Sequence, residues 1–325
     1  MAYYNIFSMR SEARVLPGIF IERLRKIIPS QKLDSVANTF AGPKPVTFRA
    51  NLLKSSPAEV RQILGDRGFR LEPAGWYRDA FILRDGRLRE LQETEIYKNG
   101  LIYVQNLSSM VPVLVLDPRP GETVLDLTAA PGSKTTQIAA FMQGQGKIVA
   151  NDNNKIRFFK LKANVELQSA VNVQVTLEYG EAFGRKRPGE FDRVLLDAPC
   201  SAEGRFDVRE PASYRYWKPG KVKEMARKQK KLFYSAVSAL KPGGVLVYST
   251  CTFAPEENEA VVDWAIRKFP GALGLEKITL PFPNQMPGLS SWDGEAFDPA
   301  VRRSLRILPT GQMEGFFITK LRKLV

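Results

Sequence analysis

The sequence predicts an α/β protein built on a mostly parallel sheet, with a smaller α+β unit ahead of it. From about Leu101 onward, short apolar runs alternate with longer segments of helical periodicity, which is typical of a parallel sheet covered by helices on both faces. Before Leu101 this alternation is absent. A chain of 325 residues also tends to divide into two domains. We therefore expect an α+β module over residues 1–98 and the sheet domain over residues 99–325.

The N-terminal module is expected to begin with two helices over residues 17–40, and Pro29-Ser30 marks the break between them. Val46–Leu53 follows as a strand, Pro57–Leu64 as a helix with proline near its first position, and Trp76–Leu83 as a second strand.

The sheet domain contains apolar runs bounded by turn residues, and these are its predicted strands. They are Thr123–Leu127, Lys147–Asn151, Val171–Leu177, Phe191–Asp197 and Gly244–Thr250. Helices are expected over residues 134–142, 154–167, 221–240 and 256–268. A last strand, Gly315–Leu321, is expected to join an edge of the sheet.

The chain holds two cysteines, and each follows an apolar run that is typical of a buried strand. Cys200 follows Val194–Leu196, and Cys251 follows Val245–Val247. Ligands of open α/β sheets bind at the carboxyl ends of the strands, so neighbouring strands would place both thiols in one cleft. The alternative is that each cysteine is a small buried hydrophobe.

The composition excludes several kinds of chemistry. No histidine is present, which rules out Ser-His-Asp and Cys-His catalysis. A structural zinc site needs about four cysteine or histidine ligands, so no metal is expected. No apolar run approaches the ~20 residues of a membrane helix, and Met1–Tyr4 does not begin a signal peptide. We therefore expect a cytoplasmic protein without a membrane partner.

A net charge of +14 and a pI near 9.7 predict a polyanionic partner, with nucleic acid ahead of a membrane. Ten basic residues lie between Arg205 and Lys231, interleaved with Tyr214, Tyr216 and Trp217. This mixture suits phosphate binding with base stacking, although a solvated helix face explains part of it. Two further basic groups are consistent with a binding groove: Arg302, Arg303 and Arg306, and Arg10, Arg14, Arg23, Arg25 and Lys26.

Three features that follow successive strands predict a cofactor pocket. The loop Thr128–Ser133 has small residues, so its backbone can approach a ligand closely. Asp152 ends the next strand, where an acid binds ribose hydroxyls, and Glu181 follows the third strand, where its carboxylate suits an adenine amine. Phosphate-loop and GxGxxG spacings are absent. S-adenosylmethionine therefore fits better than ATP or a dinucleotide, although each acid alone is equally a solvated loop residue.

Together these motifs resemble the S-adenosylmethionine-dependent RNA cytosine-C5 methyltransferases of the Nol/Nop/Sun (RsmB/RsmF-like) family. The resemblance covers most of the chain, and its paired cysteine motifs are the most specific part. It rests on the segments Arg49–Lys54, Ala129–Thr135, Asp197–Ser201, Ser249–Thr252, Pro255–Glu259 and Gly315–Phe317. Size or charge is roughly kept where this sequence departs from the family pattern, at Thr128, Ser133, Glu181 and Ala202.

The resemblance implies a class I (Rossmann-like) methyltransferase sheet and an N-terminal α+β domain that binds RNA. It makes Cys251 the nucleophile that adds to cytosine C6, Cys200 the residue that assists product release, and Asp197 a hydrogen-bond partner of the cytosine edge. Lys134 would hold this region and lower the pKa of a thiol. The implied cofactor residues are Ala129, Ala130, Pro131, Gly132, Ser133, Lys134, Asp152, Arg157, Glu181 and Asp197.

The same resemblance implies a monomeric enzyme acting on RNA, with ribosomal RNA favoured by the short architecture and transfer RNA open. Two alternatives are kept. A DNA cytosine-C5 methyltransferase would use the Pro-Cys cysteine, here Cys200, as nucleophile, whereas the Thr-Cys motif around Cys251 selects RNA. A non-catalytic RNA-binding or ribosome assembly factor would keep the fold alone, and the presence of both cysteines, Asp197 and Asp152 argues against it.

Overall fold

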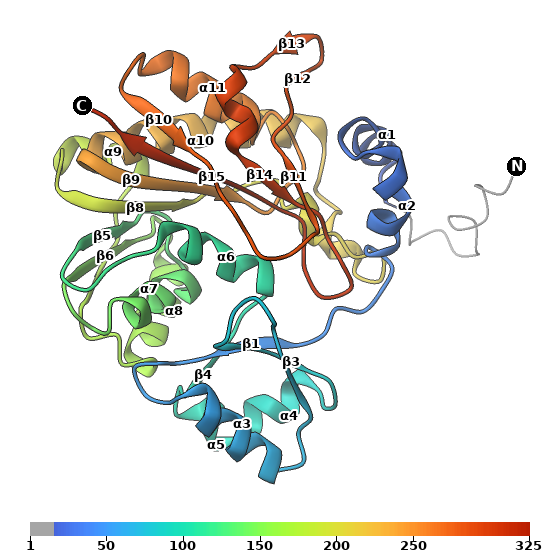
Figure 1. Ribbon diagram of the computed structural model, residues 1–325, viewed down its shortest axis with the longest axis vertical. Helices are drawn as coiled ribbons and strands as arrows, with labels where there is room; N and C mark the ends of the chain where they lie inside the picture. Colours follow the sequence, from blue (N-terminus) through green and yellow to red (C-terminus); the bar gives the residue numbers. More distant parts are fainter. Residues whose placement is uncertain (1–15) are drawn as a thin grey trace, which may run out of the picture.

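The structure is a computed structural model that describes residues 16–325. Arg10 and Arg14, which belong to the third basic group, lie outside the described residues. The described chain forms a four-stranded sheet near its N-terminus and a nine-stranded sheet after it (Figure 1). The predicted fold class, a Rossmann-like sheet preceded by a small α+β unit, is confirmed.

The small sheet has the strand order β2-β3-β1-β4, and all of its neighbours run antiparallel. Phe48 and Phe81 stack at its centre with ring centroids 5.6 Å apart, and they pack against buried residues of three helices. The module consists of β1 (Thr47–Ala50), α3 (Pro57–Asp66), β2 (Leu71–Pro73), β3 (Ala80–Leu83), α4 (Leu88–Glu93), α5 (Glu95–Lys98) and β4 (Ile102–Val104). The domain division at residue 98 stays a prediction, and β4 lies just beyond it.

Two N-terminal helices, α1 (Gly18–Ile27) and α2 (Ser30–Asn38), lie beside the large sheet domain rather than on the small sheet (Figure 1). Phe20 of α1 packs on Phe206, with ring centroids 4.9 Å apart. The predicted break at Pro29-Ser30 is confirmed, because α2 begins at Ser30. This arrangement brings α1 close to the loop that follows Cys200.

The large domain alternates strands and helices as predicted. Its strands are β5 (Thr123–Asp126), β6 (Lys147–Asn151), β7 (Val173–Thr176), β8 (Phe191–Asp197), β9 (Leu240–Thr250), β10 (Leu273–Glu276), β11 (Gln285–Pro287), β14 (Leu305–Ile307) and β15 (Phe316–Lys323). Its helices are α6 (Leu107–Leu116), α7 (Ser133–Phe141), α8 (Lys155–Leu167), α9 (Gly180–Lys186), α10 (Pro219–Ala239) and α11 (Glu259–Lys268). A separate hairpin joins β12 (Ser291–Trp292) to β13 (Glu295–Ala296).

The central strands of the large sheet are parallel and lie in the order β9-β8-β5-β6-β7. The chain builds outward from β5 through β6 and β7 on one side, and through β8 and β9 on the other. Strand order therefore reverses between β5 and β8, and ligands of open α/β sheets bind at such a switch point. In β8 and β9, Asp197 pairs with Ser249, so both cysteine motifs leave the sheet at the same level.

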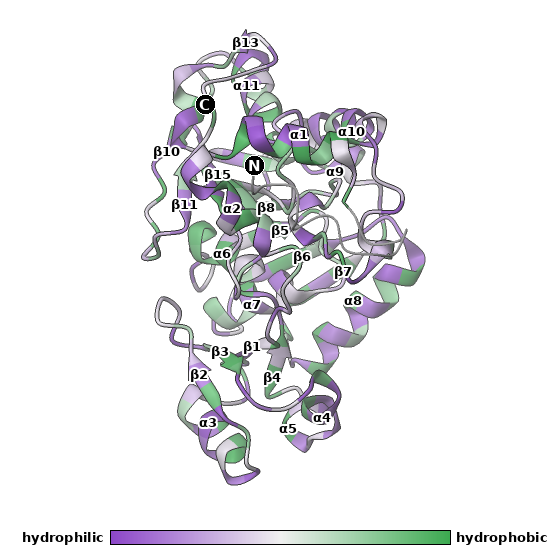
Figure 2. Cartoon of the chain, turned by 90° about the vertical axis from the view of Figure 1, so that its right-hand side faces the viewer, coloured by the Kyte–Doolittle hydropathy of each residue, from purple (hydrophilic) through white to green (hydrophobic). Residues whose placement is uncertain are grey.

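Alternate residues of β8 and β9 are buried in two different cores, which explains their continuous apolar runs. Leu195 and Val247 belong to the core on one face of the sheet, whereas Val194 and Leu246 belong to the core on the other face. Figure 2 shows α8, on the outside of the domain, as alternating hydrophilic and hydrophobic bands along its length.

The prediction of Gly315–Leu321 as an edge strand is wrong in its position. β15 covers Phe316–Lys323 and runs antiparallel between β9 on one side and β14 and β10 on the other. The sequence shows an apolar strand at this point but not the short strands that pair with its second side. These strands have only three or four residues each, too few for a periodic pattern.

Candidate functional site

A cavity of about 520 Å³ opens at the carboxyl ends of the central strands. It brings together both cysteines and most of the predicted cofactor residues, which come from segments far apart in the sequence. The predicted residues that line it are Ala129, Ala130, Pro131, Ser133, Lys134, Asp152, Arg157, Glu181, Asp197, Cys200 and Cys251. Gly132 lies behind this surface as the residue before α7.

The two thiols face each other across the ends of β8 and β9. Both cysteines are free, and their Sγ atoms lie 3.4 Å apart, within hydrogen-bonding distance for sulfur. The hydrogen bond to Cys251 and burial raise the pKa of the Cys200 thiol well above its ordinary value. The environment of Cys200 therefore favours its protonated form.

Asp197 ends β8 beside the thiols, and both of its carboxylate oxygens have protein partners. Nζ of Lys134 lies 2.7 Å from Oδ2, and Oγ of Ser249 donates to Oδ1 at 2.7 Å. Lys134 also donates to Oγ of Ser109 at 2.8 Å. The ammonium group of Lys134 is thus directed at Asp197, and Ser109 of α6 is a site residue that sequence reasoning missed.

The loop before α7 turns tightly because of Gly132, which has a φ of 108°. A Cβ atom at this position would lie 3.0 Å from Cδ1 of Leu161, so both the conformation and the space require glycine. The N-terminus of α7 faces the same cavity through Ser133 and Lys134. A negatively charged ligand group is stabilised at such a helix N-terminus.

Arg157 joins the loop to the acid at the end of β6. Its guanidinium donates to the carbonyl oxygen of Ala130 at 2.6 Å and lies 3.2 Å from Oδ2 of Asp152. The backbone N–H of Asn154 donates to Oδ1 of the same carboxylate at 2.9 Å. These contacts fix the orientation of Asp152, which is buried in the cavity wall.

Two other acids in the cavity wall have a buried oxygen without a hydrogen-bond partner. These atoms are Oε2 of Glu181, which was predicted, and Oδ1 of Asp126, which was not. Burial raises the pKa of Asp126 to about 7, although Thr135 donates a hydrogen bond to its other oxygen. An acid at the end of an apolar strand, directly before the small-residue loop, is the sequence signal that could have identified Asp126.

The Arg49–Lys54 motif joins the small module to the large domain rather than lining the cavity. The buried guanidinium of Arg49 donates to the carbonyl oxygen of Ser133 at 3.1 Å and to Oγ1 of Thr136 at 2.8 Å. Asn51 donates to the carbonyl oxygens of Gly100 and Gln168, both at 2.9 Å. The position of the loop before α7 therefore depends on the N-terminal module.

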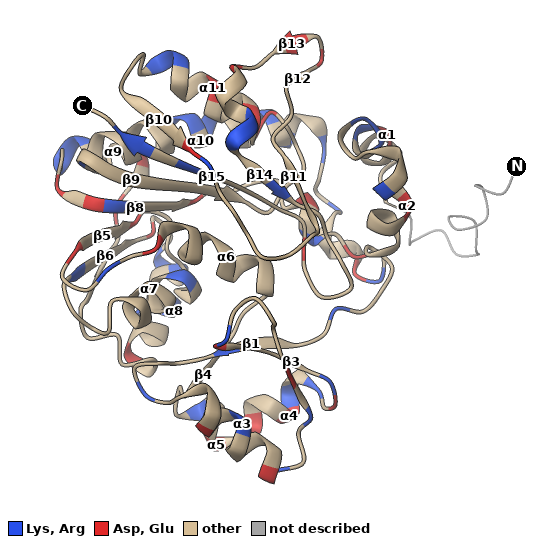
Figure 3. Ribbon diagram, viewed as in Figure 1, with Lys and Arg blue, Asp and Glu red and all other residues tan. Residues whose placement is uncertain are grey.

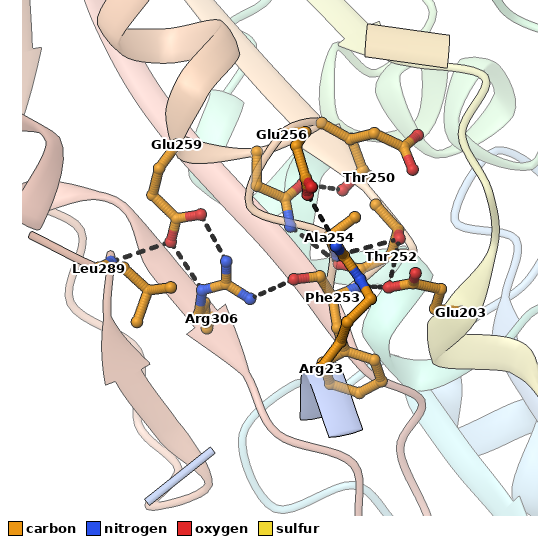
Figure 4. A network of polar contacts seen from close by, with 12 residues as sticks. Arg23, Glu203, Thr250, Thr252, Phe253, Ala254, Glu256, Glu259, Leu289 and Arg306 are labelled. Atoms are coloured by element: carbon orange, nitrogen blue, oxygen red, sulfur yellow. Dashed lines mark hydrogen bonds and ion pairs between the residues drawn. The ribbon is translucent and has the colours of Figure 1, made fainter. Parts of the chain in front are cut away.

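Several residues that were expected to face RNA are buried or partly buried instead, and their side chains contact other parts of the protein. Arg306 forms a buried ion pair with Glu259 and donates to the carbonyl oxygen of Phe253, while Arg23 pairs with Glu256 at 2.6 Å (Figure 4). Tyr214 packs in the core around Phe206. These contacts overturn the assignment of such side chains to a free basic and stacking surface, because their charged or aromatic groups are already used within the fold.

Trp217 is only partly exposed, and its Nε1 donates to Oε1 of the buried Glu203 at 3.0 Å. Tyr216 remains 80% exposed, and it alone of the three interleaved aromatic residues can stack on a base. Among residues 16–325, no group of histidine, cysteine or acidic residues is arranged to hold a metal ion. No helix in the same range has the length and apolar character needed to cross a membrane.

Proteins with sequences similar to this chain are named as methyltransferases. The chain is 42% identical over 317 residues to the tRNA (cytosine(49)-C(5))-methyltransferase of Pyrococcus abyssi, a match that covers 97% of this chain and 98% of that relative. It is 38% identical over 314 residues to ribosomal RNA small subunit methyltransferase F of Pectobacterium carotovorum, covering 95% of this chain and 63% of that protein. The chain thus spans less than two thirds of this second relative.

A solved structure of a methyltransferase homologue from Pyrococcus horikoshii matches with a TM-score of 0.79 at 31% identity, covering 95% of this chain and 100% of that one. Residues 16–107 match the model for the N-terminal domain of 16S rRNA methyltransferase RsmF. Residues 113–322, more than half of the sequence, match the model for 16S rRNA methyltransferase RsmB/F. With both models matched in order, the chain belongs to the RsmB/F family of methyltransferases.

Proposed function

We propose that this protein transfers a methyl group from S-adenosylmethionine to C5 of a cytosine in RNA through a covalent bond between Cys251 and C6. The observation that carries this proposal is the pair of thiols 3.4 Å apart, beside Asp197 and in the same cavity as the cofactor acids. The relatives named as tRNA and rRNA methyltransferases support RNA over DNA as the substrate.

The cavity fits S-adenosylmethionine by the chemistry of its wall. The unpartnered oxygens of Glu181 and Asp126 are acceptors for amine or ammonium groups, and Asp152 is an acceptor for ribose hydroxyls. The N-terminus of α7 suits the carboxylate of the amino-acid end. S-adenosylmethionine, when bound, supplies an electrophilic methyl group.

Cys251 and Asp197 make cytosine reactive in this proposal. C5 of cytosine is a poor nucleophile, and addition of a thiolate to C6 breaks the conjugation of the ring and moves electron density onto C5. Addition of the thiolate places negative charge on N3, which takes up a proton from solvent. Asp197, whose oxygens are held by Lys134 and Ser249, accepts a hydrogen bond from the N3–H so formed and thus favours the addition. In this proposal Cys251, in the Thr-Cys motif, carries the covalent bond, and the Cys200 thiol lies beside it at 3.4 Å.

Cys200 assists the second half of the reaction. After methylation, the C5 proton passes to solvent water and its electron pair re-forms the C5–C6 double bond. The C6–sulfur bond then breaks with its electron pair left on the Cys251 sulfur, to which the Cys200 thiol can donate a hydrogen bond. Cys200 is next to that bond, because its Sγ lies 3.4 Å from the sulfur that leaves. The product is then 5-methylcytosine, and both thiols return to their starting state.

The mouth of the cavity and one groove beside it supply the proposed RNA surface. Arg205 and Lys228 line the cavity itself. The neighbouring groove lies over α9 and α10, where Figure 3 shows basic residues. Its lining combines cations with aromatic rings, which suits single-stranded RNA: Tyr179, Arg185, Lys230, Lys231, Tyr234 and Trp264.

Two RNA classes are candidates for the substrate. The relative from Pyrococcus abyssi, which matches this chain over nearly its whole length, is named as a tRNA methyltransferase. The bacterial relative and the family model are named for small-subunit rRNA. The proposal includes a cytoplasmic site of action. Bisulfite sequencing of total RNA from cells with and without this protein tests the proposed methylation. One or more cytosines that lose methylation without the protein would support it, whereas an unchanged RNA methylation pattern would contradict it.

A further inference from the structure

Two buried carboxyl groups close to the thiols have no part in the reaction as proposed so far. Glu203 follows Cys200 in the chain, and Glu257 follows Cys251. Both side chains are essentially inaccessible to solvent, at 1% and 0% exposure. Burying two acids is costly unless they form specific contacts, so their partners show what they do.

Each acid bonds to the loop that carries the other cysteine. Oε2 of Glu203 accepts from Oγ1 of Thr252 and from the backbone N–H of Phe253, both at 3.0 Å. In the opposite direction, Oε2 of Glu257 accepts from the backbone N–H of Ser201 at 3.0 Å. The two side chains therefore link the cysteine loops reciprocally.

Two further hydrogen bonds join the same two loops directly. Oγ of Ser201 lies 2.8 Å from Oγ1 of Thr252, and the N–H of Gly204 donates to the carbonyl oxygen of Cys251 at 2.9 Å. A Cβ atom at Gly204 would lie 2.2 Å from the carbonyl oxygen of Gly315, so only glycine allows this approach. Each cysteine loop is thus bonded to the acid that follows the other cysteine.

We propose that Glu203 and Glu257 are a reciprocal pair of positioning residues that fix the distance between Sγ of Cys200 and Sγ of Cys251. This inference rests on the proposed function for its purpose, because both sulfurs must reach the same cytosine in successive steps. Gln229 supports the pair by donating to Oε2 of Glu257 at 2.8 Å and to the carbonyl oxygen of Pro199 at 2.9 Å.

The protonation of Glu257 adds a measurable signature. Burial raises the pKa of Glu257 to about 8, and its Oε1 has no hydrogen-bond partner. The titratable groups facing it are Glu203, Cys200 and the phenol of Tyr248. Below pH 8 the carboxyl is neutral and leaves the thiols unaffected, whereas its ionisation above that pH disfavours the Cys200 thiolate.

The test compares Glu257→Gln and Glu203→Gln with Glu256→Gln, a matched control in which the neighbouring acid loses its contact with Arg23. Alkylation of Cys200 and Cys251 by iodoacetamide is followed by mass spectrometry across pH in the full-length protein without RNA. We expect Cys200 in Glu257→Gln to react faster than in wild type only above pH 8, because the variant cannot ionise there. We expect Glu203→Gln to lose about tenfold in single-turnover methylation of total RNA. Glu257→Gln should lose less near neutral pH, because the amide has nearly the shape of the neutral acid.

Wild-type alkylation profiles and methylation rates in both test variants would overturn the proposal. Each glutamine keeps the size of the side chain, and thermal melting identifies a variant that has lost its fold. If Glu257→Gln melts early, the rescue variant Glu257→Asp is measured in its place and should recover part of the rate. Alkylation is measured without RNA, so it tests the roles of Glu203 and Glu257 by itself. A wild-type protein that does not methylate RNA would instead contradict the proposed function.

Discussion

The two sides of the cavity differ in what their buried polar atoms contact. On the cysteine side, Asp197 is held by Lys134 and Ser249, and the two thiols contact each other. On the cofactor side, Glu181 and Asp126 each present a buried oxygen that no protein group satisfies. Protein contacts thus preorganise the proposed reacting groups, whereas the proposed cofactor side leaves two acceptor oxygens for a ligand to complete. Substitutions on the cysteine side should therefore change the rate of methyl transfer, and substitutions on the other side should change the affinity for S-adenosylmethionine.

Replacement of the proposed nucleophile is the strongest test of this comparison. Cys251→Ala is expected to lower methyl transfer by at least about 10³-fold, because the proposed nucleophile for C6 is removed. S-adenosylmethionine binding measured by calorimetry should stay unchanged. Full turnover in this variant would remove Cys251 from the chemistry.

Cys200→Ala should stop the reaction later, after the covalent bond has formed. The protein–RNA adduct is expected to accumulate and to migrate as a slow band on a denaturing gel. The double variant Cys200→Ala with Cys251→Ala is the control and should give no band. An adduct that persists in the double variant would assign the covalent bond to another residue.

Asp126 tests the cofactor side through stability. Its folded pKa of about 7 lies above the usual 3.8, so the folded state holds an extra proton between these values. The free energy of unfolding should therefore fall as pH rises from about 4 to about 7, by on the order of a few kcal/mol. In urea titrations Asp126→Asn should remove this part of the slope, and an unchanged slope would contradict the raised pKa.

Asp152→Ala should weaken S-adenosylmethionine binding about tenfold, because two ribose hydrogen bonds lose their acceptor. Isothermal calorimetry measures this change, with Asp66→Ala on α3 as the control for loss of one acid. The rate at saturating cofactor should fall much less than the affinity. Equal affinity in wild type and Asp152→Ala would place the ribose elsewhere.

The smallest expected effect lies outside both sides of the cavity. Replacing Lys230 and Lys231 by alanine should weaken RNA binding a few-fold and reduce the salt dependence by about 0.7 for each lost phosphate contact. Lys160→Ala with Lys162→Ala on α8 removes the same charge at another surface. Fluorescence anisotropy should separate the pairs, and equal losses would indicate general electrostatic attraction instead of a groove.

Much of the fold could be predicted from the sequence, because the patterns that mark strands and loops involve only neighbouring residues. Parallel strands buried on both faces read as continuous apolar runs, and β5, β6, β8 and β9 were predicted from them. Their order in the chain also located the small-residue loop, Asp152 and both cysteines at strand ends. α6 was not predicted, since Val111, Val113 and Pro112 within it disfavour a helix on local grounds and burial overrides them.

The sequence by itself determined the fold class, the cysteine motifs and the positions of Asp152 and Glu181 after successive strands, because strand periodicity and loop composition are local properties of the chain. Only the tertiary structure decided which charges are free. Arg306 and Arg23 read as RNA-binding cations in the sequence, yet Glu259 and Glu256 neutralise them inside the fold. The reciprocal bonds of Glu203 and Glu257 were likewise invisible, since each acid finds its partner about 50 residues away or more in the chain. Such pairings depend on which strands become neighbours, and no local pattern records that.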